Sequence, residues 1–296
     1  MMEQQLYLAF DIGGTTIKYG IINSCGDFLE HGLILNRIRS AGVKAMLSDL
    51  GEKAKELTDK YALTAIGVST SGVIDVTTGE ILWAAPHFPD YGHCNPGQML
   101  TAATGLPCCV DNDVNCAVLG EYYRGVAKGK SPMCCLAIGT GIGGATLIDG
   151  KLLYGKGYFA GEIGHFPVAG GELEYMASTS ALVRRVAKAK NLPLEAVNGE
   201  KIFAWAKDSD KIAVDAIDVM VQALAQGLVY LIYAINPEVI VLGGAVAAQE
   251  EYLKPRIMEK LRAMVVPELL KDTEIAFSKL ENKAGMLGAI SKYLHS

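Results

Sequence analysis

Short apolar runs separated by glycine-containing turns dominate the first part of the chain. Runs of this length, bounded by turn residues, are typical of buried strands. The first three are Leu6–Phe10, Ile17–Ile22 and Phe28–Leu35. From Val43 to Tyr61 the apolar residues instead recur at helical spacing. The pattern predicts three strands followed by a long helix.

The succession of strand, glycine-rich turn and strand begins again near Pro132. Before that point we expect strands at Thr64–Thr70 and Pro107–Asp111 and a helix at Val114–Tyr123. After it we expect strands at Pro132–Ile138, Ala145–Ile148, Lys151–Tyr154, Val239–Leu242 and Glu274–Phe277, and helices at Leu173–Lys190, Ala213–Ile235 and Ala284–Leu294. Two halves that begin alike indicate a duplicated α/β architecture. Two unrelated α/β domains are the alternative, and the matching glycine turns favour duplication.

Length and composition narrow the class of protein. The 296 residues suffice for two α/β lobes or one large domain. A formal charge of −5 disfavours nucleic acid and anionic membranes as partners. We expect no signal peptide, and no apolar stretch of the roughly 20 residues that span a bilayer. The seven cysteines include two vicinal pairs but no Cys-x-x-Cys, which indicates reduced thiols in the cytoplasm rather than a zinc site.

The first glycine turn carries groups suited to binding an anion. It contains Gly13-Gly14, which would expose backbone amides, and the hydroxyls of Thr15 and Thr16. Lys18 adds positive charge if it points inward. Asp11, at the end of a buried strand, is unfavourable there unless it is paired or faces a metal ion. A tight hairpin with incidental polar residues remains the alternative.

The second glycine turn holds more glycine than a hairpin needs. It consists of Gly139, Thr140, Gly141, Ile142, Gly143 and Gly144. A strand rather than a helix is expected to follow it, so it does not fit the dinucleotide-binding fingerprint, and it lacks the lysine of a Walker loop. A third cluster, Gly243-Gly244, follows the strand at Val239–Leu242. Glycine at that strand end would let a nucleoside approach the backbone.

Five segments, taken in order, resemble the ROK family of repressors, open reading frames and sugar kinases, within the actin-like ATPase superfamily. They are the first turn, Asp111–Asn115 with its following helix, Ile138–Gly144, Gly161–His165, and Asn236–Glu238 leading to Gly243-Gly244. The resemblance covers about Leu6 to Ala289. It implies a duplicated actin-like (ribonuclease H-like) fold with two lobes around a central cleft. The expected lobes are residues 1–112 and 113–283, with the helix at about 284–296 packing back on the first, and a hinge near Asp111–Asp113.

The resemblance also implies the reaction and its residues. Asp113 would be the general base that accepts a proton from a sugar hydroxyl, the 6-hydroxyl of a hexose, as the γ-phosphoryl group arrives. The implied sugar-binding residues are Gly72, His87, Asn112, Asp113, Glu162, His165 and Glu174. The implied nucleotide-binding residues are Asp11, Gly13, Gly14, Thr15, Thr16, Lys18, Gly139, Thr140, Gly141, Gly143, Gly144, Gly243 and Gly244. ATP and Mg²⁺, the latter near Asp11, are the implied cofactors. Asn112 and Asp113 could equally cap the next helix, and both roles are compatible.

The chain departs from the family pattern in the sugar pocket. In many members the histidine equivalent to His165 is a zinc ligand, and a cysteine cluster after it supplies the other three. Here residues 166–174 contain no cysteine, so we expect no zinc, and His165 would bind sugar directly or be held by another group. His87 stands where the family usually has asparagine. These departures leave N-acetylmannosamine, glucose and a β-glucoside as candidate substrates.

Two other functions are weighed against a cytoplasmic, homodimeric sugar kinase. A sugar-responsive transcriptional regulator of the same family would need a DNA-binding domain, for which we expect no room before Leu6. An actin-like ATPase of the filament or chaperone type would not need the sugar-ligand motif at Glu162 and His165. The sequence favours the kinase.

Overall fold

Two compact units make up the chain in the computed structural model, which describes residues 5–84, 88 and 90–294. The first unit comprises residues 1–128, 154–159 and 282–296, and the second comprises 129–153 and 160–281. Compared with the expected lobes, the first unit therefore also takes in the helix after Asp113 and a short segment that begins at Tyr154.

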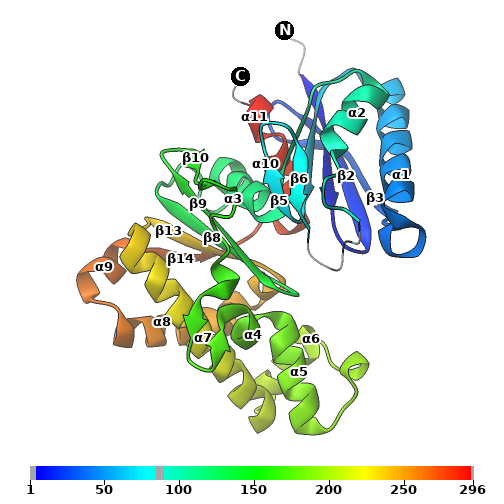
Figure 1. Cartoon of the computed structure of the whole chain (residues 1–296). Helices are drawn as coiled ribbons and strands as arrows, with labels where there is room; N and C mark the ends of the chain where they lie inside the picture. The colour runs from blue at the N-terminus through cyan, green and yellow to red at the C-terminus, as the bar shows by residue number, and fades with distance from the viewer. Residues whose placement is uncertain (1–4, 85–87, 89, 295–296) are drawn as a thin grey trace. The chain divides into compact units, whose positions relative to one another are not determined.

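A five-stranded sheet forms the centre of the first unit, where Figure 1 labels β2 and β3. The strand order is β3-β2-β1-β4-β7. Its strands are β1 (Leu6–Ile12), β2 (Thr16–Asn23), β3 (Phe28–Leu35), β4 (Leu63–Thr70) and β7 (Cys108–Asn112). The strands β1, β2 and β3 pair antiparallel, whereas β4 and β7 run parallel to β1. A separate hairpin of β5 (Val73–Asp75) and β6 (Glu80–Trp83) follows β4.

The second unit repeats this topology strand for strand. Its sheet has the order β10-β9-β8-β13-β14, with two antiparallel and then two parallel pairings. The strands are β8 (Met133–Ile138), β9 (Ile142–Ile148), β10 (Lys151–Leu152), β13 (Val239–Gly244) and β14 (Glu274–Phe277). A small hairpin of β11 (Pro167–Val168) and β12 (Gly171–Glu172) lies outside this sheet. The equal order and direction of the strands confirm the predicted duplicated α/β fold.

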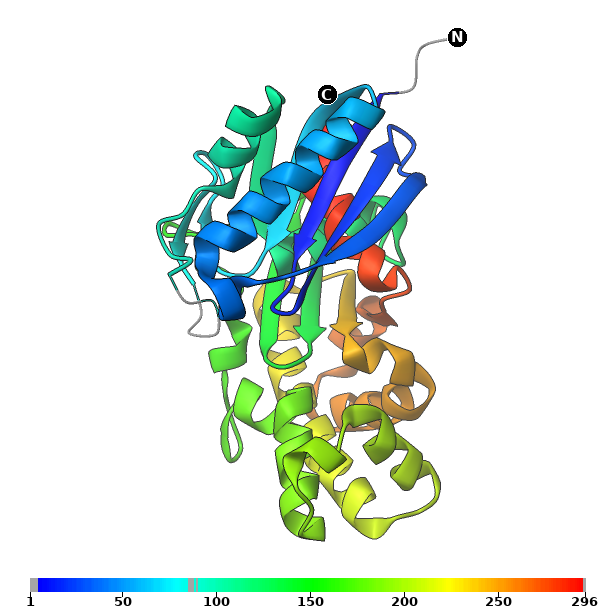
Figure 2. The ribbon, with the colours of Figure 1, turned by 90° about the vertical axis from the view of Figure 1, so that its right-hand side faces the viewer.

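Helices cover both faces of the first sheet. The long α1 (Ile38–Lys60) lies along one face (Figure 2), where its Met46 and Leu50 belong to one apolar core with Leu8 and Phe10 of β1. The helix α2 (Pro96–Thr104) packs beside α1, and the other face is covered by α3 (Asp113–Arg124), α10 (Ala284–Ala289) and α11 (Ser291–Leu294). Alternate β1 residues therefore face different helices, and both faces are buried.

Two glycines let α3 and α10 cross at backbone contact. A Cβ atom on Gly288 of α10 would lie 1.7 Å from the carbonyl oxygen of Cys116, and one on Gly120 of α3 would lie 2.3 Å from that of Ala284. No side chain fits at either point. This crossing attaches α10 to α3 within the first unit.

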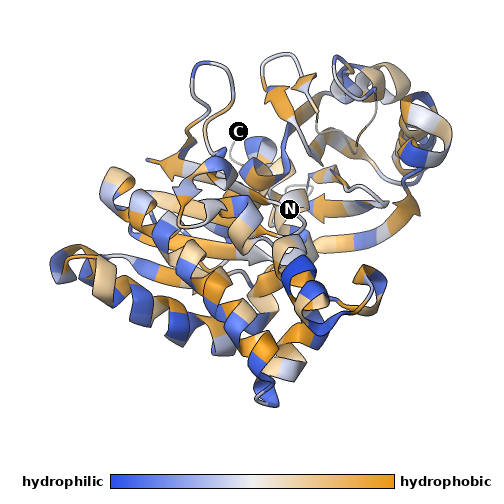
Figure 3. Ribbon diagram, turned by 60° about the horizontal axis from the view of Figure 1, so that its bottom comes forward, coloured by the Kyte–Doolittle hydropathy of each residue, from blue (hydrophilic) through white to orange (hydrophobic). Residues whose placement is uncertain are grey.

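Helices α5 (Thr179–Lys190), α6 (Gly199–Lys207), α7 (Lys211–Ile235) and α8 (Glu250–Met264) build the core of the second unit with its sheet. Two shorter helices are α4 (Leu173–Ala177) and α9 (Pro267–Asp272). Figure 3 shows hydrophilic and hydrophobic residues alternating along the helices, as expected where one face packs inward. We expected no apolar stretch long enough to span a bilayer, and α7 contradicts this, since its length and composition would allow it to do so. However, 56% of the most apolar part of α7 is buried within the protein.

The observed elements show where local patterns were misleading. The helix expected at Leu173–Lys190 is two helices, because Ser178 is extended and accepts the N–H of Ala181 at 3.1 Å as the cap of α5. The glycine turn in the second unit is shorter than predicted, since Gly143 and Gly144 belong to β9. The helix α1 starts at Ile38, before the predicted start at Val43. Because Gly42 has non-helical backbone angles, the uninterrupted helix begins only after that glycine.

Candidate functional site

The β1–β2 hairpin brings the predicted anion-binding groups together. Its register pairs Asp11 with Lys18, and the Lys18 ammonium lies 3.1 Å from Asp11 Oδ2. The hydroxyl of Ser69, on the neighbouring β4, donates to Asp11 Oδ1 at 2.8 Å. Asp11 is therefore paired, which explains how a carboxylate is tolerated at the end of a buried strand.

The turn after β1 is held by side chains that the sequence did not single out. The N–H of Gly13 bonds to Thr16 O at 3.0 Å, and the Asn36 amide donates to Gly13 O at 2.7 Å. A guanidinium nitrogen of Arg39 lies 3.6 Å from the position of a Cβ on Gly14. Arg39 thus adds a second positive charge near this turn, and only the fold reveals it because 25 residues of chain separate the two positions.

The predicted catalytic turn lies where β7 ends and α3 begins. Asn112 caps α3, and its Oδ1 accepts the N–H groups of Val114 at 2.8 Å and Asn115 at 3.2 Å. Its Nδ2 donates to Gly72 O at 3.0 Å. Asp113 is the first residue of α3, and its Oδ1 accepts the N–H of Val114 at 3.0 Å. The capping role is therefore present, and the structure brings Gly72, Asn112 and Asp113 together in one unit.

A part-buried carboxylate, that of Asp111, lies beneath this turn, and the sequence assigned it no role. Asp111 accepts hydrogen bonds from the Tyr154 hydroxyl at 2.6 Å, the Asn115 amide at 2.9 Å and the Asn112 N–H at 2.7 Å. Burial raises the pKa of Asp111, and these hydrogen bonds oppose that rise. The network ties the backbone of Asn112 and the side chain of Asn115, on either side of Asp113, to one carboxylate.

Strands β8, β9 and β13 assemble the glycine clusters of the second unit. The N–H of Gly139 bonds to Gly141 O at 2.9 Å, which closes the tight turn between β8 and β9. The β13 register places Gly243 beside Ala137 and Gly244 beside Ile138, at the end of β8 that leads into this turn. The two predicted nucleotide-binding clusters of this unit are therefore neighbours.

The remaining predicted sugar ligands lie around the short helix η1 (Ile163–His165). Glu162 precedes η1, and the ring of His165 lies 3.0 Å, Nδ1 to Oε2, from Glu172. Glu174 instead has its Oε2 on the backbone N–H of Ile142, at 2.9 Å. One further predicted sugar ligand, His87, lies outside the described residues.

Glu172 is the other group that holds His165. The β11–β12 hairpin pairs Pro167 with Glu172 and so folds the carboxylate back towards the ring. The hydrogen bond to Glu172 raises the pKa of His165 above its ordinary value. The stabilisation that the protein gains from the His165–Glu172 interaction is therefore fully present below the ordinary histidine pKa. It is lost as pH rises through the raised pKa of His165.

We expect Glu172→Gln to lower the pH midpoint at which the His165 imidazole titrates, because a neutral amide no longer favours the charged ring. The midpoint can be followed by NMR of the imidazole resonances. An unchanged His165 midpoint would show that Glu172 does not hold the ring in solution.

Metal-ligating side chains do not gather into a larger cluster in the part of the chain that the structure describes. No group of three or more His, Cys, Asp or Glu residues there is arranged to hold a metal ion. Among the predicted nucleotide-binding residues only Asp11 is acidic. One carboxylate fits Mg²⁺, which keeps several waters and takes its other ligands from substrate phosphates.

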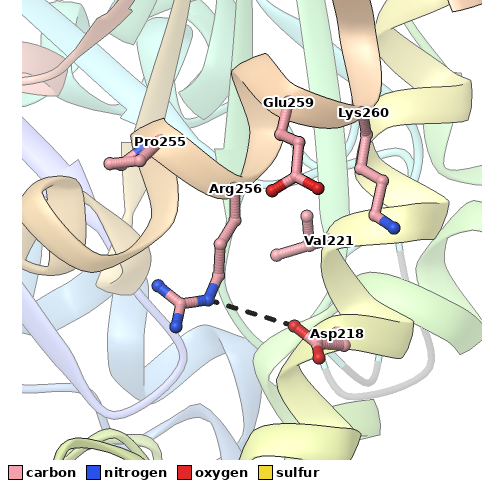
Figure 4. A pocket seen from close by; sticks show the side chains of 6 residues that line it. All are labelled: Asp218, Val221, Pro255, Arg256, Glu259 and Lys260. Atoms are coloured by element: carbon pink, nitrogen blue, oxygen red, sulfur yellow. Dashed lines mark ion pairs between the residues drawn. The ribbon is translucent and has the colours of Figure 1, made fainter. Parts of the chain in front are cut away.

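A cavity of about 380 Å³ lies elsewhere, between α7 and α8 of the second unit (Figure 4). Arg256 and Asp218 form an ion pair across it, with Nε and Oδ1 4.0 Å apart. Its lining contains none of the predicted site residues, and both signs of charge are present. It therefore adds nothing to the candidate site.

Comparison with known proteins gives a consistent result. The model of the ROK family matches residues 7–294. A β-glucoside kinase of Listeria monocytogenes is 33% identical and is covered to 96%, with 97% of this chain aligned. The structure of a ROK-family glucokinase from Streptomyces griseus, in complex with glucose and AMPPNP, superposes with a TM-score of 0.82 at 26% identity, covering 96% of this chain and 97% of that one.

A regulator is also similar in structure. It is a ROK-family transcriptional regulator, a homologue of the E. coli MLC protein, with a TM-score of 0.88 at 26% identity. The match covers 98% of this chain but 78% of the regulator. Similarity of fold alone therefore does not distinguish a sugar kinase from a transcriptional regulator.

Proposed function

The chain belongs to the ROK family, and from that premise we propose that it is an ATP-dependent sugar kinase transferring the γ-phosphoryl group to the 6-hydroxyl of a hexose. The observation that carries the proposal is the turn at Asn112–Asp113. There a carboxylate stands at the start of a helix, beside an amide that is bonded to Gly72. The relatives that are named as β-glucoside kinase and glucokinase support the same class of enzyme.

In this proposal Asp113 acts as the general base. Its carboxylate accepts the proton of the 6-hydroxyl as that oxygen attacks the γ-phosphorus, and the bond from the γ-phosphorus to the ADP leaving oxygen breaks. Asn112 holds the turn in place through its cap and its bond to Gly72. Asp111 supports the same turn from beneath, because it binds the N–H of Asn112.

The glycine turns bind the nucleotide. The backbone amides of Gly14 and Gly141 are the donors for phosphate oxygens, since those of Gly13 and Gly139 are bonded within their turns. Lys18 and Arg39 add positive charge. Asp11 would hold Mg²⁺ through the waters of the ion, which would neutralise charge on the phosphates. Gly243-Gly244 leave room for the nucleoside at the end of β13.

The sugar binds through Glu162 and His165, with Glu174, Gly72 and His87 completing the proposed ligand set. With Nδ1 of His165 facing Glu172, its Nε2 is the atom that contacts a hydroxyl. The candidate sugars are glucose, a β-glucoside and N-acetylmannosamine. We also propose that the enzyme works in the cytoplasm as a homodimer, without nucleic-acid or membrane partners.

A sugar panel in a coupled ADP-release assay tests this proposal. We expect at least one of the three candidate sugars to raise ADP release far above the sugar-free rate, because the base needs an acceptor hydroxyl in place. ADP release that no sugar stimulates would overturn the proposal and favour an actin-like ATPase.

A regulator is the second candidate, favoured by the TM-score of 0.88 to the MLC homologue. It predicts sequence-specific retention of DNA in a gel-shift assay at low salt. If the protein is instead a sugar kinase without DNA-binding function, we expect no such retention of DNA.

A further inference from the structure

The Glu174 carboxylate contacts the glycine turn that we propose binds phosphate. Its Oε2 accepts the N–H of Ile142 at 2.9 Å, and a Cβ on Gly141 would lie 2.4 Å from the same oxygen. A negative charge beside a phosphate-binding turn opposes nucleotide binding by repulsion. Its presence there calls for a role other than charge complementarity to the nucleotide.

The loop at 161–165 packs backbone to backbone on the same turn. The N–H of Gly144 bonds to Gly161 O at 2.9 Å. A Cβ on Gly164 would lie 2.4 Å from Ile142 O and 3.5 Å from the Cβ of Glu174. The loop therefore cannot shift without moving Ile142 or Glu174, since interiors packed this closely transmit displacement.

The two helices after this loop hold the other side of the turn. The N–H of Thr179, the first residue of α5, bonds to Gly139 O at 2.9 Å. The N–H of Ser178 bonds to Glu174 O at 3.1 Å, which joins the end of α4 to that anchor. Glu174 and Thr179 thus bind the turn at Ile142 and at Gly139, on opposite sides of Gly141.

From this geometry we infer that Glu174, besides its proposed contact to the sugar, positions the 139–142 turn and so couples sugar binding at 161–165 to nucleotide binding there. The inference rests on the proposed function, which assigns the two ligands to these two segments. Sugar bound to Glu162 and His165 immobilises the loop at 161–165. Through Glu174 it also immobilises Ile142. By thermodynamic linkage, bound nucleotide must raise the affinity for sugar by the same factor by which bound sugar raises the affinity for nucleotide.

Calorimetry of the full-length protein tests the coupling. The Kd of MgAMPPNP is measured without sugar and with a saturating amount of the sugar most active in the ADP-release assay. We expect sugar to tighten AMPPNP by about 5-fold or more in the wild type. In Glu174→Gln the ratio of the two Kd values is expected to fall towards one, since the charge-assisted hydrogen bond to the Ile142 N–H becomes a neutral one of about half the strength.

Gly141→Ala breaks the same link while keeping the charge of Glu174 and the backbone N–H at position 141. The new methyl group would lie 2.4 Å from Glu174 Oε2 and displaces the carboxylate. The ratio should fall as in Glu174→Gln, and the double variant should show no further loss, as two changes to one contact are not additive. Tyr175→Phe, at a side chain 65% exposed, is the matched control that should keep the wild-type ratio.

The outcomes separate this inference from the proposed function. An enzyme that phosphorylates sugar but shows a wild-type ratio near one, or keeps its ratio in both Glu174→Gln and Gly141→Ala, overturns the coupling alone. A protein that phosphorylates no sugar in the panel overturns the proposed function.

Discussion

Asp113→Asn is expected to lower kcat by about 10²- to 10⁴-fold, the range of a lost general base. Asparagine is isosteric and can still accept the N–H of Val114, which Asp113 now accepts at 3.0 Å. It cannot take up the hydroxyl proton. Calorimetry should therefore show sugar affinity within a few-fold of wild type, while the coupled ADP assay shows the loss of turnover.

Asp59→Asn is the control for this substitution, because Asp59 is exposed on α1 and carries none of the proposed roles. Its kcat should equal that of the wild type. Near-normal turnover in Asp113→Asn would contradict the assignment of the base. Loss of sugar binding and turnover together would instead show that Asp113 is chiefly a sugar ligand.

Gly288→Ala is expected to destabilise the protein by about 3 kcal/mol, at the upper end of the range for overpacking. The added Cβ would lie 1.7 Å from the carbonyl oxygen of Cys116, an atom of helix backbone that cannot rotate away. The helices α3 and α10 must therefore separate. Urea unfolding followed by circular dichroism measures the effect as a lower midpoint.

Gly92→Ala is the matched glycine control, since a Cβ there meets no atom within 4 Å. Its midpoint should stay close to that of the wild type. If Gly288→Ala shifts the midpoint no more than Gly92→Ala does, the close crossing of α3 and α10 is not a feature of the folded protein.

Strongly periodic segments were predictable because local pattern and tertiary packing agree there. The strands at Phe28–Leu35 and Glu274–Phe277 occupy the predicted residues, since their apolar runs are bounded by turn residues. The helix α2 escaped notice although Asn95 caps it and Pro96 starts it. Its nine residues are too few to show a helical period beside the surrounding loop residues.

The site was predictable as a set of motifs, but its supporting contacts were not. Asp111 and Tyr154 are 43 residues apart, and only the fold brings the hydroxyl to the carboxylate. Glu172 lies seven residues after His165, yet its role depends on a two-residue hairpin pairing with no clear sequence signal. Such contacts follow from tertiary packing, which the spacing of residues along the chain does not determine.

The ADP-release assay with an accepted hexose and its 6-deoxy analogue tests the central claim most directly. The account predicts rapid ADP release with the hexose and only the sugar-free rate with the analogue, because the analogue lacks the hydroxyl from which Asp113 takes the proton. Equal ADP release with both sugars, accompanied by a phosphorylated 6-deoxy product, would contradict transfer to the 6-hydroxyl.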